Sequence, residues 1–406
     1  MDIIFFYIWA ALLTVIGGAF WIFSKKIVLW EWLVGATLAF VMAGIFHLSA
    51  SIGATSDVET WSGEVVSGRH YSAWTEYYEE AIYKTERYYV TESYTYTTGS
   101  GKNRTTHHGT RRVEKTRRVF SHWAPRTKRH NDSYELSSNI QTSYYVSPQV
   151  WEDIALKFGD KKVVKGDRST FEHNSKMIAG DPNDYVTSNK TAHIVPITKL
   201  VSFENKIRAT PTAFSFPKVP QNISVYPYPE NSNPFQSDRL VGTARKYIDQ
   251  LTFDRLNARL GPRKKVNLII VGFSNRDSMT AQWQEAAWLR GKKNDVVITF
   301  SHGQGGQLQW VKAFGWTDKK TCLRNLETIV LDNGVNNSTL NLIENEIVKN
   351  YTLKNWEEDF AYIRVPAPAW AVWMYFTVSV LAQIAFWFFA HNNEYEKGGR
   401  VWRYRY

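Results

Sequence analysis

The segment from Lys102 to His130 carries most of the excess positive charge of the chain. It holds ten lysines and arginines and four histidines but one acid, Glu114, in a chain whose formal net charge is +11. A dense row of cations can bind lipid headgroups, an anionic polymer or nucleic acid. It can equally be a solvated sheet edge that charge protects against pairing with other strands. The candidate anion-binding or partner-binding residues are Arg111, Arg112, Lys115, Arg117, Arg118, Arg126, Lys128 and Arg129.

The same segment has the pattern of one half of a β-hairpin. Residues 87–98 are rich in Tyr, Thr and Val, residues 99–103 have the composition of a turn, and residues 111–120 resume a strand pattern. Tyrosines beside cations suit base stacking, but the placement outside the cytoplasm argued below makes nucleic acid the least favoured partner. The four histidines match no standard zinc spacing, so we expect no metal or other cofactor.

A second candidate is the short sequence Ser301–Gly306, which joins two apolar runs. Its backbone N–H groups could hold an anion, and His302 could act as a general base. The spacing of a P-loop is absent, and the serine before His302 points in a different direction on an extended chain. The plain alternative is a hairpin turn in which Gly303, Gly305 and Gly306 supply backbone freedom.

The elements around this turn alternate between helix and strand from residue 236 to residue 365. Gly261 and Pro262 are expected to end a helix that begins at Thr252, and Thr317 is expected to cap another that runs through Val330. The expected helices span 240–251, 252–260, 279–289, 317–330 and 338–349, and the expected strands span 266–273, 295–300 and 307–311. This order predicts a small α/β sandwich.

The sequence from residue 240 to residue 350 resembles the TPM domain, a small α/β domain that is often attached to a membrane. The resemblance rests on the order and spacing of residues 266–273, 287–295, 296–300, 308–311 and 314–318. It covers about 110 of the 406 residues. The whole layout is also similar to uncharacterised membrane proteins of phages and bacteria.

Members of the TPM family have been described as phosphatase-like, as photosystem maintenance factors and as modulators of membrane receptors. Their phosphatase and metal roles involve acids in the loop between two adjacent strands, and the corresponding loop here contains none. The resemblance therefore implies, as an alternative, a metal-dependent phosphohydrolase. Its catalytic residues would be His302 and Asp318, and its metal ligands Asp295 and Asp318.

Residues 51–235 are expected to form a β-rich domain that contains the basic hairpin. Runs rich in Tyr, Val, Thr and Trp predict strands at 61–66, 81–98, 110–120 and 139–146. From about residue 167 the chain is polar and punctuated by prolines, which indicates irregular sheet followed by an extended linker. The single cysteine, Cys322, excludes an internal disulfide and is expected to be a packed thiol.

Three apolar runs predict transmembrane helices at 3–23, 27–49 and 366–391, because each has about the 20 residues that span a bilayer. The first two form a domain of residues 1–50, and residues 392–406 form a basic tail. Short basic segments stay in the cytoplasm. We therefore expect the N-terminus outside, Lys25 and Lys26 inside, the large domain outside and the C-terminus inside. In a bacterium this places the large domain in the periplasm and the helices in the inner membrane.

These observations predict a membrane protein with an extracytoplasmic α+β region, made of the β-rich unit and the TPM-like sandwich. The expected function is non-enzymatic: an anchored interaction or modulator protein. Besides membrane lipid, its expected partner is another membrane or envelope protein, or an anionic polymer. A pore or transporter is disfavoured, because the spans carry almost no polar residues. Small residues could allow helices of several copies to pack into an oligomer, at Gly17, Gly18, Gly35, Ala36 and Gly44.

Overall fold

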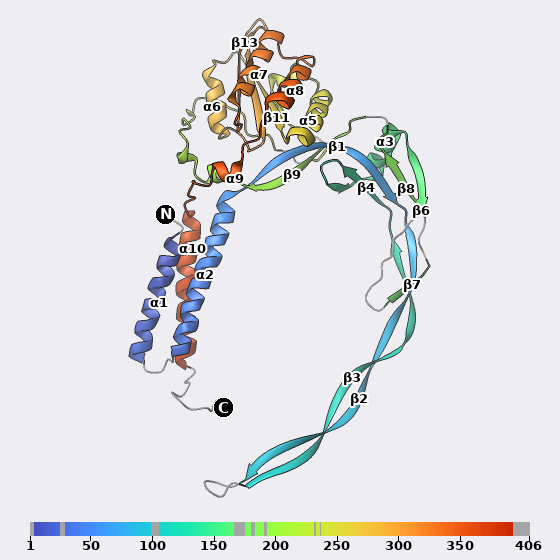
Figure 1. The fold of residues 1–406 in the computed structure, drawn as a ribbon, viewed down its shortest axis with the longest axis vertical. Helices are drawn as coiled ribbons and strands as arrows, with labels where there is room; N and C mark the ends of the chain where they lie inside the picture. The colour runs from blue at the N-terminus through green and yellow to red at the C-terminus, as the bar shows by residue number, and fades with distance from the viewer. Residues whose placement is uncertain are drawn as a thin grey trace. The chain divides into compact units, whose positions relative to one another are not determined.

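The computed structural model describes residues 4–24, 29–98, 105–165, 175–179, 183–190, 193–230, 233–235 and 237–392. The chain divides into two units, and Figure 1 labels their elements. The first unit comprises Met1–Glu64 and Pro196–Tyr406, and the second comprises Val65–Val195. This division differs from the expected boundary at residues 235 and 236, because the segment after Pro196 belongs with the α/β domain.

Three helices of the first unit are long and apolar enough to cross a membrane, as the sequence predicts: α1 (Phe5–Ser24), α2 (Leu29–Thr55) and α10 (Ala369–Asn392). They pack on one another through buried residues that include Phe6, Ala43 and Tyr375. An added Cβ at Gly17 or at Gly35 would press on the ring of Trp387. The end of α10 therefore lies beside the end of α1 and the beginning of α2, so the polar part of the chain leaves the bundle at the opposite end.

The polar groups of these helices find partners inside the bundle. The amide of Gln383 donates to the carbonyl oxygen of Gly35 at 3.0 Å, and the Trp9 indole donates to the hydroxyl of Ser379 at 3.1 Å. Such contacts suit an apolar surrounding, where a polar group without a partner is costly. Of the glycines proposed for contacts between copies, Gly17 and Gly35 are used within the chain, whereas an added Cβ at Gly44 would meet nothing within 4 Å.

The α/β domain of the first unit is built on a four-stranded sheet. Its order is β10 (Leu240–Gly242), β11 (Asn267–Ser274), β12 (Asp295–His302) and β13 (Leu308–Gly315), with β13 antiparallel to the three parallel strands. One face packs on α5 (Gln250–Lys264), α7 (Lys320–Asn333) and α8 (Thr339–Asn350). The other face packs on Trp288, directly after α6 (Met279–Ala287), and on Tyr226 and Tyr228. The predicted mixed α/β architecture of this region is confirmed.

Three local predictions in this domain were wrong. Residues 240–251 do not form one helix: Leu240–Gly242 pair with β11, and a 3-10 turn, η2 (Thr243–Lys246), follows Gly242, whose φ is +63°. Pairing in the sheet thus overrides an apolar spacing that also suits a helix. Gly261 and Pro262 lie inside α5, which Asp249 caps. Thr317 does not cap α7; its hydroxyl donates to the carbonyl oxygen of Thr352 at 2.8 Å.

A two-stranded ribbon connects the apolar helix α2 to this domain. Strand β1 (Ser56–Tyr71) follows α2 directly, and its residues 56–64 pair with β9 (Pro196–Glu204). Short helical segments surround it: α4 (Lys206–Ala209), η1 (Pro211–Ala213) and α9 (Trp356–Asp359).

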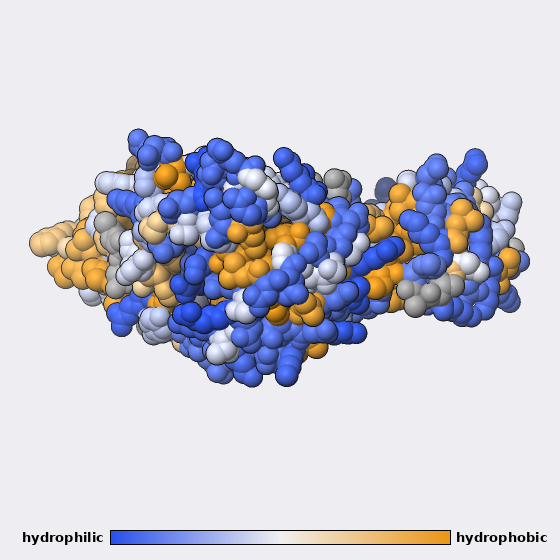
Figure 2. All heavy atoms as spheres, turned by 90° about the horizontal axis from the view of Figure 1, so that it is seen from above, coloured by the Kyte–Doolittle hydropathy of each residue, from blue (hydrophilic) through white to orange (hydrophobic). Residues whose placement is uncertain are grey.

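The face shown in Figure 2 is mainly hydrophilic, and its apolar residues form separate patches between polar ones.

The second unit contains a small sheet with one helix. The remaining part of β1 pairs with β4 (Ser133–Ser138) and β8 (Asn183–Ser188), which are flanked by β5 (Ser143–Tyr145) and β6 (Lys161–Lys165). Helix α3 (Pro148–Phe158) buries Trp151 and Phe158. Helix α3 is not among the elements predicted from the sequence, although Ser147, Pro148 and Gly159 are standard residues at helix ends.

A long hairpin extends from this sheet, as predicted. Strands β2 (Trp74–Thr98) and β3 (Thr105–His130) pair antiparallel along their whole length, and β7 (Ser175–Ala179) pairs only with residues 77–80 of β2. Beyond β7 the hairpin is a twisted two-stranded ribbon (Figure 1). At about 3.3 Å per residue, 25 residues of β2 reach roughly 80 Å. We call β2 and β3 together the β2–β3 ribbon.

Gly261 tests the contact between α5 and β1. An added Cβ there would overlap the carbonyl oxygen of Ser62. We expect Gly261→Ala to lower the free energy of unfolding by about 2 kcal/mol, because backbone yields less readily than a side chain. In the control Gly305→Ala, the methyl group meets only the flexible Gln307 side chain. Thermal unfolding of the solubilised chain measures both, and equal stabilities would contradict the close approach of α5 to β1.

Candidate functional site

Asp295, a predicted alternative metal ligand, is fully buried at the start of β12. Its carboxylate accepts hydrogen bonds from the Asn267 amide at 2.8 Å, the Tyr228 hydroxyl at 2.8 Å and the backbone N–H of Lys292 at 2.7 Å. Burial raises the pKa of Asp295 despite these donors. A carboxylate with three protein donors and no access to solvent joins neighbouring segments and leaves no open position for a metal-bound substrate.

Asp318, the second alternative ligand, has a half-exposed side chain and forms an ion pair with Lys354 at 3.0 Å. The same Lys354 also contacts Asp359 at 3.0 Å. Within the described residues, no three His, Cys, Asp or Glu side chains are arranged to hold a metal ion. Asp295 and Asp318 therefore have separate structural partners, and the geometry does not favour a metal centre built from them.

His302 ends β12 and is 7% exposed. Its ring stacks on Tyr247 at 4.2 Å between centroids, its Nδ1 has no hydrogen-bond partner among the described residues, and burial lowers its pKa. The hydroxyl of Ser301 instead accepts from the backbone N–H of Arg276 at 3.1 Å and donates to the Gln309 amide oxygen at 3.3 Å. Ser301 and His302 thus do not form a nucleophile and its base.

The glycines after His302 form a tight turn between β12 and β13. The N–H of Gly303 donates to the carbonyl oxygen of Gln307 at 2.9 Å, and the N–H of Gly306 donates to that of Gly303 at 3.0 Å. These two N–H groups are therefore occupied within the turn. Gly306 has a φ of +78°, which favours glycine. The geometry matches the plain hairpin turn, while Gly305 remains without an assigned binding role.

Cys322 is also a core residue. It is completely buried among the residues that α7 and α8 pack against the sheet. Burial raises the pKa of its thiol to about 12, so the reactive thiolate is scarce at neutral pH. The prediction of a packed thiol is confirmed.

The basic residues of the second unit form the strongest candidate. Cross-strand register places Arg112 opposite Thr91 and Arg118 opposite Thr85, on one face of the β2–β3 ribbon. Arg111, Lys115 and Arg117 lie on the other face. A one-residue step along a strand changes the face, so the predicted cluster is divided between the two sides. Lys102 and Arg104 lie outside the described residues.

On the second face, acids of β2 contact the cations of β3. Lys115 contacts Glu92 at 2.7 Å, Arg117 contacts Glu86 at 3.3 Å, and Arg111 lies 3.7 Å from Glu92. Nearer the base, Arg126 contacts Glu80 at 2.9 Å. Exposed pairs of this kind contribute little stability each. They do, however, neutralise part of the positive charge that the sequence showed as one block.

On the first face, two arginines lie over tyrosines. Arg112 is 4.3 Å from the ring centre of Tyr89, and Arg118 is 5.3 Å from that of Tyr83. Among the described residues neither arginine has a carboxylate partner. Tyr89 is 55% exposed, so these rings are open to solvent rather than parts of a core. The β2–β3 ribbon therefore presents cations and aromatic rings on its surface together. Lys128 and Arg129 lie in the base of the same strand.

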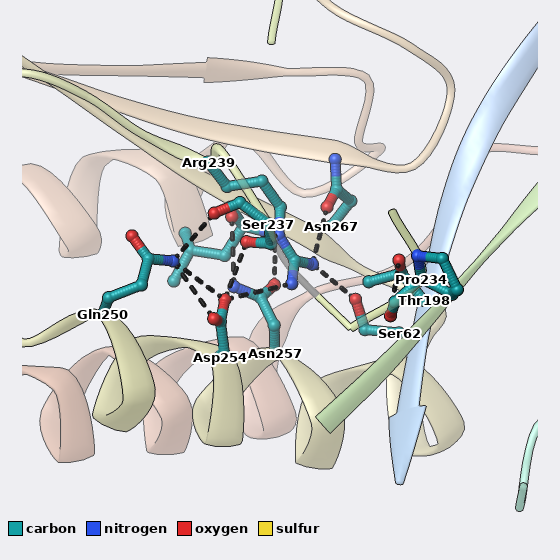
Figure 3. A network of polar contacts seen from close by, with 10 residues as sticks. Ser62, Thr198, Pro234, Ser237, Arg239, Gln250, Asp254, Asn257 and Asn267 are labelled. Atoms are coloured by element: carbon teal, nitrogen blue, oxygen red, sulfur yellow. Dashed lines mark hydrogen bonds and ion pairs between the residues drawn. The ribbon is translucent and has the colours of Figure 1, made fainter. Parts of the chain in front are cut away.

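A buried polar network, which the sequence analysis missed, fixes β1 to the α/β domain (Figure 3). Arg239 is 1% exposed and donates to the Ser62 hydroxyl of β1, to the Asn267 amide oxygen at 3.1 Å and to the Ser237 hydroxyl at 2.8 Å. It also contacts Asp254 at 3.5 Å. Burial lowers the pKa of Arg239 to about 10. Nothing in the local sequence distinguishes this arginine from an exposed one.

Further ion pairs join the same two parts. Asp57 of β1 pairs with Lys292, and Glu59 pairs with Lys293 at 3.2 Å. The Asn294 amide donates to the carbonyl oxygen of Thr60 at 2.8 Å. These contacts hold β1, and with it the end of α2, against the loop before β12.

No protein-family model matches the chain, and neither the curated proteins nor the solved structures contain a match to it. The resemblance to the TPM domain accordingly stays a prediction. The geometry described above is therefore the basis for the functional proposal.

Removing the Arg239 guanidinium should leave the buried Asn267 amide oxygen without this donor and Asp254 without its cationic partner, although Ser237 and Gln250 still donate to the Asp254 carboxylate. We expect Arg239→Met to lower the free energy of unfolding by about 3 kcal/mol, as breaking a buried ion pair does. The control is Arg263→Met in α5, where the exposed guanidinium lies 3.5 Å from Glu344 and should contribute under about 1 kcal/mol. Denaturant unfolding of both variants measures the difference, and similar losses would show that the Arg239 network is not a main stabilising contact.

Proposed function

We propose that this chain is a membrane-anchored, non-enzymatic binding protein that uses the β2–β3 ribbon to recognise an anionic component or a membrane protein of the cell envelope. The observation that carries the proposal is the exposure of cations and tyrosines along a ribbon that has no core of its own. An isolated two-stranded hairpin is marginally stable in water. A long ribbon with exposed cations and tyrosines therefore contributes little to the stability of the fold, and binding a partner is the better explanation for it.

The proposed location follows from the helix bundle and the charge of its short segments. The end of α1, the beginning of α2 and the end of α10 lie at one end of the bundle. In the sequence, Lys25 and Lys26 follow α1, and Lys397, Arg400, Arg403 and Arg405 follow α10. Short basic segments favour the cytoplasmic side. The α/β domain and the second unit would then lie outside the cytoplasm, where lipid headgroups, envelope proteins and anionic polymers are accessible.

The alternative of a metal-dependent phosphohydrolase is less well supported by the geometry. Asp295 is buried and accepts three hydrogen bonds, Asp318 forms an ion pair with Lys354, and the ring of His302 stacks on an aromatic ring. Metal-assisted hydrolysis requires several ligands and an open position at one place. In the proposal, the α/β domain is a rigid support that carries the binding unit.

Charge reversal on the ribbon tests the proposed binding. We expect the variant with Arg111, Arg112, Arg117 and Arg118 all changed to Glu to lose at least tenfold in affinity for vesicles containing one third anionic phospholipid or for immobilised polyglutamate, because the cationic surface becomes acidic. Co-sedimentation and pull-down of the purified full chain measure these affinities. Binding of the parent chain should weaken as salt is raised.

The matched control reverses four exposed cations of the α/β domain instead: Arg263, Lys312, Lys319 and Lys320. It changes the net charge equally and should leave affinity within about twofold if the ribbon is the binding element. Equal losses in both variants would contradict a localised site. Divalent-metal-dependent turnover of a phosphoester, abolished by Asp318→Asn, would favour the hydrolase instead.

Cysteine labelling in intact cells tests the proposed topology. In a Cys322→Ala background, a membrane-impermeant maleimide should label Thr97→Cys at the end of β2 but not Gly398→Cys in the C-terminal segment. The expected difference follows from the retention of short basic segments in the cytoplasm. Permeabilised cells, in which both sites should react, provide the control. The reverse labelling pattern would place the ribbon in the cytoplasm and remove envelope components as its partners.

A further inference from the structure

Among the described residues, no strand is hydrogen-bonded to the outer edge of β3. The three-stranded sheet has the order β3-β2-β7, so β3 is an edge strand along the described residues 105–130. In an antiparallel sheet, alternate residues direct their N–H and C=O groups to the outer side. Such a row of unpaired groups is a template for another extended chain.

The base of β3 has backbone features that block such pairing, whereas residues 105–120 are protected only by the charge of their side chains. The register shift between Ile82 and Tyr83 leaves Ser121 as an extra residue, and Pro125 follows it. A bulge and a proline are both common means of blocking an edge. Residues 105–120 contain neither, so sixteen consecutive residues of β3 remain competent to pair.

The charge of this open edge selects the partner. Residues 105–120 contain five cations, which are Arg111, Arg112, Lys115, Arg117 and Arg118, and one acid, Glu114, so their net charge is +4. Strand β2 has two cations and five acids, and strand β3 has eight cations and one acid. The whole ribbon therefore has ten cations and six acids, which again gives a net charge of +4. A second copy of this ribbon would be repelled, whereas an acidic strand would be attracted.

The positions of Arg112 and Arg118 predict the spacing of the acids in the partner strand. They lie on the same face, six residues apart, and are the arginines that rest on tyrosine rings without a carboxylate among the described residues. A strand paired with β3 brings directly opposite side chains within about 5 Å. Two acids six residues apart on one face of that strand would therefore each meet one guanidinium, while the residue opposite Glu114 should be neutral.

We propose that residues 105–120 of β3 bind an acidic, extended polypeptide segment by strand addition. The inference rests on the proposed binding function and names its partner chemistry. Backbone hydrogen bonds supply affinity, and the carboxylates opposite Arg112 and Arg118 supply selectivity. This is the general mode of β-augmentation on an open sheet edge.

The test uses the full chain in detergent and a sixteen-residue peptide of alternating Thr and Val, in which two Thr residues six positions apart are replaced by Glu and the residue opposite Glu114 stays neutral. Amide hydrogen exchange should show new protection in residues 105–120 on binding and none in residues 121–130. A peptide of the same sequence with methylated backbone nitrogens keeps the charge but cannot donate hydrogen bonds, and it should bind at least tenfold more weakly. Equal binding of the two peptides without new protection would overturn strand addition.

A pair of matched variants locates the selectivity. The double variant Arg112→Gln and Arg118→Gln should weaken binding of the acidic peptide about fivefold, as the loss of two exposed ion pairs does. The control, Lys319→Gln with Lys320→Gln, removes the same charge from exposed positions of the α/β domain and should change binding less than twofold. Equal losses would mean that charge alone attracts the peptide, which overturns the inference and leaves the proposed function intact. Failure to bind peptide, polyglutamate and anionic vesicles alike would refute both.

Discussion

The attachment of strand β1 to the α/β domain is the contact on which the rest of the chain depends. Helix α2 ends at Thr55 and β1 begins at Ser56, so no linker separates the apolar helix from the strand. The first nine residues of β1 pair with β9, and its remaining residues enter the second unit. The same strand therefore belongs to both units, and its polar contacts decide how firmly the apolar helix α2 is joined to the α/β domain.

These contacts are effective because they are buried and paired. Burial alone would raise the pKa of Asp57, but hydrogen bonds from Lys292 and Asn205 and the charge of Lys292 lower it. Its contribution to stability is therefore complete at neutral pH and is lost as the pH falls through the folded-state pKa. In the Arg239 network the buried group is a cation, and removing a cation from water is costly. The guanidinium is tolerated because four groups accept its N–H groups: Ser62, Asn267, Ser237 and Asp254.

The elements that the sequence predicted well are those whose signal is local. The three apolar helices follow from length, the strands β11 and β12 from short apolar runs, and the β2–β3 ribbon from its Tyr-rich and Thr-rich composition. The failures depend on distant partners. Leu240 pairs with Ile270, and Arg239 donates to the hydroxyl of Ser62, which is distant from it in sequence. Position 261 requires glycine inside a helix because the carbonyl group of Ser62 approaches it closely. This contact spans about 200 residues, so no local pattern in the sequence indicates it.

The β2–β3 ribbon shows why a cluster in sequence is not yet a site. In sequence, Arg111, Arg112, Arg117 and Arg118 form one basic block, but a strand places neighbours on opposite faces. Glu86 and Glu92 then neutralise one side, while Arg112 and Arg118 retain only tyrosine rings. A cation over an exposed ring keeps N–H groups that can still donate to a carboxylate. The proposed binding therefore depends less on the total charge than on Arg112 and Arg118, which have no carboxylate partner among the described residues.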